Sequence, residues 1–495
     1  MVGIGSLLAM GLAFAVVVER DGVIRTGPST ALPPHLVEWG GFRGPNGTGV
    51  ATSAVALPKR LDPDTNVRWT RKFPKGYSSP VVAGDRLFLT AEGPKALYTV
   101  CLDRWSGDKL WHQEVALDGE IASQRNSSAS PSAATDGEVI CVLFHNAGLI
   151  TYDVEGEELW RLPAYPFAVQ HGMSTSPILH GERVIMVADQ QRGGYIVALD
   201  RRTGREIWRA DRSDHTYSYS TPAVYAPPEG PAELIVSGSN RVEGYSIDDG
   251  TRRWWVEGAG WLTKGVPAIA DGVAYVNTFV PMTDRLEDGE RLQPWSRVLD
   301  RRDRDGDGRI AASEWKDVST KTSWETMDDD GDGVLDEEEY TLLLERTRQN
   351  GALFAIRLGG EGDVTKSHVL WKVEPPGLPD VTSPLVVGDS VITVGHGGIV
   401  IAYDRRTGER RARRRVGAPD DYYASPILGD DKVYLLGYSG LVTTLRVGKK
   451  ISVLASGDLG QTAFATPAIA GDCVFIRTER AMWCFGAGGA QRDPR

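Results

Sequence analysis

Two acidic stretches in the second half of this chain carry residue types whose spacing could bind a metal ion. In the first, carboxylates occupy positions 1, 3, 5 and 12 of a twelve-residue loop, and position 7 can add its backbone carbonyl. These residues are Asp303, Asp305, Asp307, Arg309 (through its carbonyl) and Glu314. Calcium takes about six to eight hard oxygen ligands, and a bidentate glutamate at position 12 completes such a set. The stretch therefore predicts a calcium site.

The second stretch repeats the pattern at every ligand position. Its ligands would be Asp328, Asp330, Asp332, Val334 (through its carbonyl) and Glu339. In both loops a glycine at position 6 permits the sharp turn, and an apolar residue at position 8, Ile310 or Leu335, can pair the two loops as a short strand. Two full matches in tandem predict two bound Ca²⁺ ions. The alternative, a disordered acidic hairpin, does not explain the apolar eighth positions.

The flanks of these loops predict short helices, because apolar residues recur there at helical spacing. They are Trp295, Val298 and Leu299 before the first loop, and Tyr340, Leu343 and Leu344 after the second. The block at 295–346, with only residues 315–327 between its loops, resembles the EF-hand pairs of extracellular proteins. This resemblance implies a structural calcium module of modest affinity. We expect calcium to fold the block without altering the rest of the protein.

The elements that must carry this block are indicated by a cycle of eight prolines. Each follows a Ser, Thr or Val and opens an apolar run, a turn and a second apolar run. They are Pro80, Pro131, Pro177, Pro222, Pro267, Pro384, Pro426 and Pro467. Their spacings are 51, 46, 45, 45, 117, 42 and 41 residues, and a period in the forties is the signature of propeller blades. The long interval holds the acidic block.

Each copy contains four short β-rich runs, which predict a four-stranded antiparallel blade. The eighth copy ends near Phe485, one strand short, while the run around Trp69 precedes the first copy without partners. We therefore predict an all-β, eight-bladed propeller closed by the N-terminal strand, since closure leaves no open sheet edge. Residues 273–279 and 352–358 read as the second and third strands of blade five. The block 295–346 is thus a small α-helical insertion that should overhang the channel face preceding each proline.

The motif Ala198-x-Asp200-x-x-Thr203-Gly204-x-x-x-Trp208 resembles the tryptophan-docking motif of the PQQ-repeat, quinoprotein-like β-propellers. Its ring recurs at Trp111, Trp160, Trp254 and Trp371, whereas Ala412 replaces it in copy six and copy seven has none. The resemblance covers residues 66–486 and implies that each large ring docks between neighbouring blades. We expect blades six and seven to be less regular.

A turn-rich segment within the linker 21–65 carries a second resemblance. Trp39-x-x-Phe42-Arg43-Gly44-Pro45-x-Gly47-x-Gly49 is similar to the start of planctomycete-type exported propellers. We expect Trp39 and Phe42 to pack against the rim of the ring, and a binding role for the segment is the alternative.

Charge and the chain ends limit partners and location. The formal net charge is −11, but residues 300–339 hold 15 acids and 6 bases, a net of −9, so nucleic-acid binding has no electrostatic support. An uncharged apolar run in residues 1–20 predicts a signal peptide or an uncleaved anchor, hence an exported, periplasmic or cell-surface protein, with membrane association if uncleaved. No lipobox cysteine follows, so lipidation is not expected. Residues 487–495 are predicted to be a disordered tail.

The four cysteines leave two alternatives open. Cys473 and Cys484 lie on the last predicted hairpin, where a disulfide would be feasible in an exported protein. Buried thiols that serve as small apolar residues are the other reading.

Polar and aromatic residues precede the prolines and would surround the mouth of the channel. They are Tyr77, Ser78, Arg125, Asn126, His171, His215, Tyr217, Tyr219, Lys264, Asp380, Asp421, Tyr422, Tyr423 and Gln461. Such a mouth is a common ligand site, although these residues could simply hydrate it. His171 and His215 lack a third ligand, so the pattern does not favour a metal there.

We predict a protein- or ligand-binding scaffold with calcium at both loops, and an unknown protein or small molecule as the partner at the funnel. The alternative, implied by the family resemblance, is a PQQ-dependent quinoprotein dehydrogenase that oxidises alcohols or sugars with PQQ in the funnel. Many of those enzymes stack the quinone on a vicinal disulfide, and this chain has no Cys-Cys pair. We assign no catalytic residue and do not expect PQQ.

Overall fold

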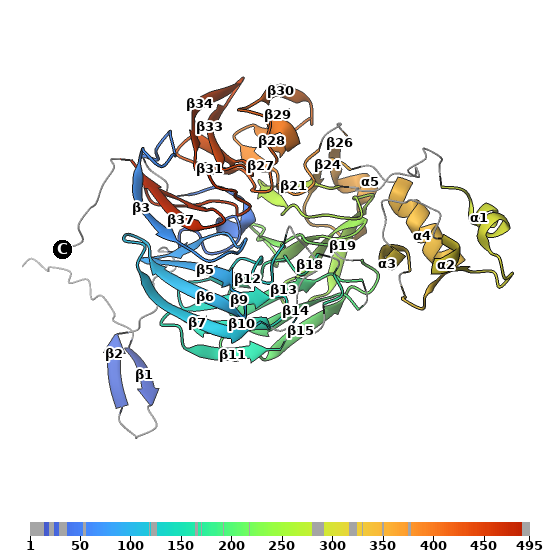
Figure 1. Cartoon of the computed structure of the whole chain (residues 1–495), viewed down its shortest axis with the longest axis horizontal. Helices are drawn as coiled ribbons and strands as arrows, with labels where there is room; N and C mark the ends of the chain where they lie inside the picture. The colour runs from blue at the N-terminus through green and yellow to red at the C-terminus, as the bar shows by residue number, and fades with distance from the viewer. Residues whose placement is uncertain are drawn as a thin grey trace, which may run out of the picture.

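The structure is a computed structural model that describes residues 14–18, 24–28, 37–52, 56–117, 119, 126–163, 167–169, 171–191, 193–216, 218–279, 292–315, 324–328, 330–348, 351–374 and 378–487. Eight sheets, each built on four antiparallel strands, follow one another around a channel (Figure 1). This confirms the predicted eight-bladed propeller. Most of the predicted signal segment 1–20 and tail 487–495 lies outside the described residues. Within them, β1 (Phe14–Val18) pairs with β2 (Ile24–Pro28), and no helix is long and apolar enough to cross a membrane.

The strands of each blade run outward from the channel in chain order, except that the outermost strand of blade eight comes from the start of the repeat region. Blade one holds β4 (Val81–Ala83), β5 (Arg86–Glu92), β6 (Ala96–Asp103) and β7 (Lys109–Ala116). Blade two holds β8 (Ala134–Thr135), β9 (Val139–Phe144), β10 (Gly148–Asp153) and β11 (Glu158–Leu162). Blade three holds β12 (Ile178–His180), β13 (Arg183–Ala188), β14 (Tyr195–Asp200) and β15 (Glu206–Asp211). Blade four holds β16 (Ala223–Tyr225), β17 (Glu233–Ser237), β18 (Arg241–Ser246) and β19 (Arg252–Glu257).

The second half of the ring repeats this order. Blade five holds β20 (Ala268–Ala270), β21 (Val273–Asn277), β24 (Leu353–Arg357) and β26 (Val369–Val373). Blade six holds β27 (Leu385–Val387), β28 (Ser390–Gly395), β29 (Ile399–Asp404) and β30 (Arg410–Arg415). Blade seven holds β31 (Ile427–Gly429), β32 (Lys432–Leu436), β33 (Leu441–Val447) and β34 (Ile451–Asp458). Blade eight holds β35 (Ala468–Ala470), β36 (Cys473–Arg477), β37 (Ala481–Gly486) and β3 (Val67–Lys72).

The last blade closes the ring with the first strand of the repeat region. β3 pairs antiparallel with β37, so that Trp69 faces Cys484 and Thr70 faces Trp483. The predicted closure by the Trp69 strand is therefore confirmed. Because the outermost strand of blade eight precedes blade one in the chain, the two ends of the ring hold each other.

Tryptophans lock neighbouring blades together, as the docking motif implies. Trp208 Nε1 donates to the Ile247 carbonyl at 3.0 Å, and its ring lies against Gly250, where a Cβ would come within 2.5 Å of the ring. The same bond joins Trp69 to Arg104, Trp111 to Val154, Trp160 to Arg201 and Trp371 to Arg405. Each aromatic ring thus requires a glycine in the turn of the next blade.

The other three blade junctions lack this contact, and at two of them described residues make a different one. Trp254 instead donates to Glu233 Oε2 at 3.0 Å. The turn of blade five that would receive it is occupied by β25 (Gly362–Asp363) and α5 (Thr365–His368). β25 also pairs with β19 and so extends blade four as a parallel fifth strand. At the next junction Arg414 Nη1 bonds to the Ile451 carbonyl at 2.7 Å. β33 and β34 pair over seven residues of β33. Arg414 thus links blade six to blade seven in place of a tryptophan. The irregularity expected of these two blades does not show in their strand pairing.

Hydroxyl groups join the blades around the channel axis. The backbone N–H of Ser383 donates to Ser425 Oγ at 3.0 Å, and the N–H of Ser425 donates to Thr466 Oγ1 at 3.0 Å. The same link runs from Ser79 to Ser132, from Ser132 to Ser176, from Ser176 to Thr221 and from Val266 to Ser383. The Ser or Thr at this position is thus a structural element of the ring in the blades where these links are made.

The hydrogen bonds of this circle show that the second proline of the predicted cycle, Pro131, was assigned wrongly. In seven blades the innermost strand begins directly after the proline, whereas β8 begins at Ala134 and Ser132 occupies the linking position. Ala133, and not Pro131, therefore holds the proline position of blade two. The sequence misled because Ser130-Pro131 imitates the dipeptide two residues too early.

Replacing Ser425 by Ala should lower the free energy of unfolding by about 1–3 kcal/mol, the usual cost of leaving a buried donor without its acceptor. The donor is the Ser383 N–H, and Ser425 is only 2% exposed. Urea unfolding of the variant measures the loss. Ser452→Ala, at an exposed position of β34, is the control, and an equal effect of the two substitutions would contradict the role of the circle.

Candidate functional site

A segment before the propeller crosses the channel axis and closes one end of it. Trp39 forms a bridge with Val82 of blade one, and Val50 forms one with Leu428 of blade seven. Between them, Asn46 exchanges hydrogen bonds with the backbone of Val224 in blade four. Val82, Val224 and Leu428 all come after the proline position of their blades. The segment therefore lies at the end of the channel opposite to the residues that precede the prolines. Trp39 is fully buried, which corrects the expectation that the segment packs on the rim.

Arg43 clamps this crossing segment in place. Its Nη1 donates to the Gly47 carbonyl and its Nη2 to the Pro384 carbonyl of blade six, each at 3.0 Å. Complete burial lowers the pKa of Arg43 to about 9. Its partners are carbonyls, which accept hydrogen bonds without supplying a neutralising charge, so this residue holds structure and is not a site for chemistry.

The other end of the channel is a funnel with a volume of about 490 Å³. Its lining consists of Phe42, Tyr77, Ser79, Asn126, Ser130, Ser132, His171, Ser174, Ser176, Tyr219, Lys264, Asp380, Val381, Tyr423, Ser425, Phe464 and Thr466. Phe42 of the crossing segment contributes to this lining, so the funnel is backed by that segment. The lining combines hydroxyls of the axial circle with aromatic rings.

The funnel brings together half of the residues predicted from the sequence. Tyr77, Asn126, His171, Tyr219, Lys264, Asp380 and Tyr423 line it. Ser78 instead accepts a bond from the buried Arg477, and Tyr422 is 1% exposed within the core. Asp421 and Gln461 bond to His396 and Thr478 outside the lining. Arg125 and Tyr217 lie outside the described residues.

Sequence reasoning missed the hydroxyls and two aromatic rings of the funnel. The missed hydroxyls are those of the axial circle: Ser79, Ser132, Ser176, Ser425 and Thr466. All but Ser132 directly precede a proline of the repeat, so the sequence marked their positions but not their place in the funnel. The missed aromatic rings are those of Phe42 and Phe464. Phe42 could not be found, because nothing in the sequence indicates that a segment outside the repeat enters the channel.

His215 belongs to a buried ion cluster between blades three and four, which corrects its predicted place at the channel mouth. Arg212 bonds to Asp189 through Nε and Nη2 at 2.5 and 2.8 Å, and through Nη1 to Glu243 and to the Tyr245 hydroxyl. His215 Nε2 lies 3.0 Å from Glu243 Oε2. The side chains of Arg212, Asp189, Glu243 and His215 have no solvent exposure. The cluster is therefore structural.

Charged groups at the funnel mouth are paired with one another. Asp380 lies 3.6 Å from Lys264 Nζ and 3.0 Å from His396 Nε2, while His396 Nδ1 lies 3.1 Å from Asp421. Burial alone would raise the pKa of Asp380, but the hydrogen bond from His396 and the charge of Lys264 hold it below its usual value. The hydrogen bond to Asp380 raises the pKa of His396, against a smaller opposing effect of burial.

His396 should therefore make the stability of the protein depend on pH. Its folded pKa is raised, so its stabilising contribution is complete below the unfolded value of about 6.5 and is lost as pH rises through the folded pKa. The difference in free energy of unfolding between the wild type and His396→Gln should be larger at pH 5.5 than at pH 8.5. His112→Gln, on the outer strand β7, is the control. A difference that does not change with pH would contradict the assignment.

Aromatic rings form two walls of the funnel. On one side the ring centroid of Phe464 lies 4.5 Å from Tyr77 and 5.1 Å from Tyr423. On the other side His171 stacks on Tyr219 at 6.3 Å with an interplanar angle of 26°. The first wall comes from blades one, seven and eight and the second from blades three and four, so only closure of the ring sets them in one funnel.

The inserted block forms helices on either side of two loops (Figure 1). Its elements are α1 (Trp295–Arg302), β22 (Ile310–Ala311), α2 (Ala312–Trp315), α3 (Trp324–Met327), β23 (Val334–Leu335) and α4 (Glu337–Arg348). Ile310 pairs with Leu335, as the eighth loop positions predict. The block follows β21 and precedes β24, which is the predicted place of attachment.

The carboxylates of each loop converge. One ligand oxygen from each of Asp303, Asp305 and Asp307 lies within 4.8 Å of the others, and the same holds for Asp328, Asp330 and Asp332. Glu314 Oε1 and Oε2 accept the N–H groups of Arg304 and Ala311, each at 2.8 Å, and Glu339 makes the equivalent bonds to Asp330 and Asp336. The twelfth residue therefore lies beside its own loop in both cases.

The second loop contacts the propeller. Gln191, after β13, donates its Nε2 to the Asp328 carbonyl at 3.3 Å. Tyr219, Trp261 and Leu262 of the propeller share one hydrophobic cluster with the core of the block, which includes Trp295, Leu335 and Tyr340. Tyr219 precedes a proline, so the block covers the channel face that blade connectivity predicts. The same Tyr219 forms part of the funnel wall.

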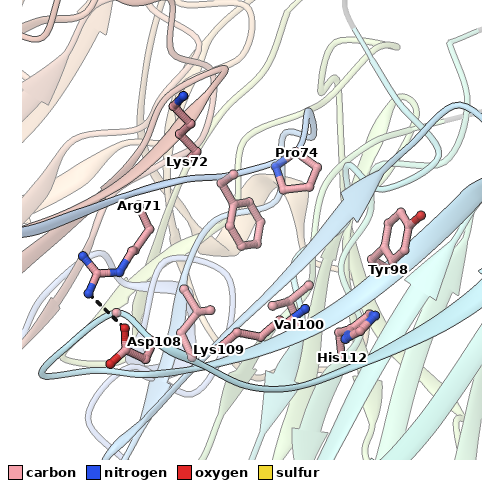
Figure 2. A pocket seen from close by; sticks show the side chains of 11 residues that line it. Arg71, Lys72, Pro74, Tyr98, Val100, Asp108, Lys109 and His112 are labelled. Carbon is pink, nitrogen blue, oxygen red and sulfur yellow. Dashed lines mark hydrogen bonds and ion pairs between the residues drawn. The ribbon is translucent and has the colours of Figure 1, made fainter.

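A second hollow lies on the outer surface between blades eight and one (Figure 2). It has a volume of about 460 Å³, with Phe73, Val100 and Leu102 among its apolar residues. Arg71 Nη2 pairs with Asp108 Oδ1 at 3.0 Å across it, the dashed contact in Figure 2. The lining comes from two adjacent blades, whereas the funnel gathers residues from all parts of the ring, and we therefore place the candidate site in the funnel.

The four cysteines are buried and unpaired. Cys473 faces Gly486 and Cys484 faces Phe475, so the two thiols are diagonal neighbours on β36 and β37, and Arg68 Nη1 lies 3.1 Å from Cys473 Sγ. Burial raises the pKa of Cys101 and of Cys141 to about 12. These two thiols are therefore small core residues and not nucleophiles.

Comparison with known proteins adds a family to this geometry. The sequence profile described as outer membrane protein assembly factor BamB matches residues 45–192, 98–255 and 192–488. The chain belongs to this family. A protein from Yersinia pestis with the same description is 21% identical over 274 residues, which are 54% of this chain and 63% of that relative. The match thus covers less than two thirds of the relative's length.

Solved structures agree on the architecture of this family. BamB from Moraxella catarrhalis superposes with a TM-score of 0.53 at 11% identity, over 85% of this chain and 99% of that one. The computationally designed protein Ika8 reaches 0.51, also at 11% identity, over 88% and 99%. A computationally designed protein matches nearly as well as a natural one, so these likenesses establish the fold alone.

Proposed function

We propose that this chain is an exported scaffold whose propeller binds a partner at the funnel and whose inserted loops hold calcium. The observation that carries the proposal is the funnel itself, a hollow where hydroxyls and aromatic rings from across the ring converge. Convergent polar groups in a concave site are typical of ligand recognition. A binding role requires no catalytic residue in the funnel.

The relatives support a protein partner and a location outside the cytoplasm. Their description, outer membrane protein assembly factor, names a process that involves other proteins. The apolar N-terminal run of this chain is in keeping with export. The partner could engage the funnel mouth and the surface of the inserted block together, because both lie at the same end of the channel.

The loops fit calcium in their donor set and their turns. Gly308 and Gly333 have φ of 83° and 90°, which suits the sixth position of each loop. Asp328 Oδ1 is buried without a hydrogen-bond partner in the described part of the chain, as expected of an atom that a cation would satisfy. Asp303, Asp305, Asp307, Arg309 and Glu314 would hold one ion and Asp328, Asp330, Asp332, Val334 and Glu339 the other. Calcium would act there as a structural cross-link.

The alternative of a PQQ-dependent dehydrogenase has less support. PQQ carries several carboxylates, which need cationic partners. Lys264, the one Lys or Arg among the described lining residues, already lies 3.6 Å from the carboxylate of Asp380. A funnel with balanced charge gives such an anion little electrostatic attraction.

Two measurements test the proposal. Calorimetric titration of the chelator-treated full chain with calcium should show two sites, and the absence of binding heat would contradict the calcium assignment. Incubation with PQQ and calcium should leave no bound cofactor and no dye reduction with alcohols or sugars. Retained cofactor with turnover would instead establish the enzyme.

A further inference from the structure

The funnel lining defines the kind of ligand that fits it. We propose that the funnel binds the end of a neutral oligosaccharide. This inference rests on the proposed binding function and names its ligand class. It follows from the charge, the hydroxyls, the aromatic walls and the closed floor of the funnel.

The charge of the lining does not favour an ionic ligand. Lys264 and Asp380 lie 3.6 Å apart, and Asp380 also bonds to His396 at 3.0 Å. A carboxylate or phosphate on the ligand would have to compete with Asp380 for these cations, and an ammonium would have to compete with Lys264. A neutral ligand leaves the existing pairs intact.

The lining does not favour an apolar ligand either. Among the lining residues that the structure describes, Val381 is the one aliphatic side chain, whereas seven carry hydroxyl groups on Ser or Thr. Covering these hydroxyls with hydrocarbon would cost free energy without returning hydrogen bonds. The ligand must therefore bring polar groups of its own.

The axial hydroxyls line the funnel and keep hydrogen-bonding capacity, although Ser79, Ser132 and Ser176 are each only 1–2% exposed. Ser132 and Ser176 each accept one backbone N–H on the oxygen, which leaves a second lone pair and a rotatable hydrogen. Ser79 is 1% exposed, and its Oγ has no partner within the described part of the chain. Sugar hydroxyls also donate and accept at once, so they match this floor better than a group that only accepts.

The aromatic walls match the remaining surface of a sugar ring. Phe464 and Tyr423 line one side and are partly exposed, while Tyr219, 7% exposed and stacked on His171, lines the other. A pyranose ring has two faces of C–H groups between its equatorial hydroxyls, and aromatic rings recognise such faces by stacking. Polar edges and apolar faces therefore both find partners in the funnel.

The closed floor sets the direction of entry. Phe42 contributes to the lining from the crossing segment, so a chain cannot thread through the channel. Only the end of a glycan can enter, and the volume of about 490 Å³ is within the usual range for a ligand of a few hundred daltons.

Calorimetric titration of the full chain, with calcium present, tests the inference. The probes are cellobiose, maltose, xylobiose and N,N′-diacetylchitobiose, with digalacturonic acid as the acidic counterpart. At least one neutral disaccharide should bind saturably, and the acid should bind at least about tenfold more weakly. Tyr423→Ala should weaken the neutral probe about tenfold, while Tyr423→Phe, which keeps the ring, should bind within about twofold of the wild type.

The control substitution is Tyr98→Ala on β6, the third strand of blade one and outside the funnel lining, and thermal unfolding confirms that each variant folds. Absence of binding by every neutral probe, tighter binding of the acid, or equal effects of Tyr423→Ala and Tyr98→Ala would each overturn the inference. Calcium titration and capture of a protein partner are measured on the same samples. If those succeed while no sugar binds, the proposed function stands and the ligand class is wrong.

Discussion

Replacing Arg212 by Met is expected to lower the free energy of unfolding by about 3–5 kcal/mol, the cost of removing one partner from a buried ion pair. Arg212, Asp189 and Glu243 have no solvent exposure, and the guanidinium bonds to both carboxylates. Burial alone would raise the pKa of Glu243, but the charge of Arg212 holds it far below its usual value. Without the guanidinium of Arg212, the carboxylates of Asp189 and Glu243 would stay buried between blades three and four and lose a neutralising partner. Urea unfolding measures the loss.

Two further variants separate charge from packing. Arg161→Met, on the exposed strand β11 where Arg161 pairs with Glu158, should cost no more than about 1 kcal/mol. Adding Asp189→Asn and Glu243→Gln to Arg212→Met should recover part of the stability, because neutral amides leave no unpaired charge. A triple variant as unstable as Arg212→Met would contradict the electrostatic explanation and indicate lost packing.

Replacing Glu339 by Gln is expected to weaken calcium binding at the second loop by at least about 100-fold, since even the partners of metal ligands contribute 10–100-fold. The same variant should increase amide hydrogen exchange at Gln191 and Tyr219. The physical reason is the shared hydrophobic cluster of the block and the propeller, together with the bond from Gln191 to Asp328. Calorimetry measures the affinity, and exchange mass spectrometry with and without calcium measures the coupling.

Glu314→Gln is the matched control for this coupling. It removes the same ligand from the first loop, whose aspartates bond within the loop in the described structure. It should weaken calcium binding with a smaller change in exchange at the funnel. If Glu339→Gln weakens calcium binding but leaves exchange in the propeller unchanged, the block folds independently, as the sequence led us to expect. If neither variant affects calcium binding, the metal assignment is wrong.

Most of the architecture was predictable because a propeller repeats a local pattern. The proline cycle, the turns and the alternating apolar runs specify each blade from neighbouring residues, and the surplus Trp69 run matched the missing strand of blade eight. The error at Pro131 has the same origin, since a local dipeptide was read without the hydrogen bonds that identify Ser132 as its true counterpart.

The candidate site was only half predictable. Tyr77, His171 and Tyr423 precede prolines and line the funnel, whereas His215 has the same sequence context but turns into the ion cluster. Position along the repeat determines which end of the channel a residue approaches. It does not determine whether the side chain points into the channel or between two blades, since that depends on charged partners such as Glu243 from the next blade.

The sequence by itself determined the eight-bladed ring, the place of the insertion and the carboxylate spacing of both loops, because each is recorded within one repeat or one loop. It also determined the closure, because one strand was surplus before the first repeat and one was missing from the last. The tertiary structure alone decided that the crossing segment closes the channel, that Phe42 and the axial hydroxyls build the funnel, and that the second loop touches the funnel wall. These features join segments hundreds of residues apart, such as Arg43 and Pro384. Such segments meet only after the ring has closed, so no local pattern records them.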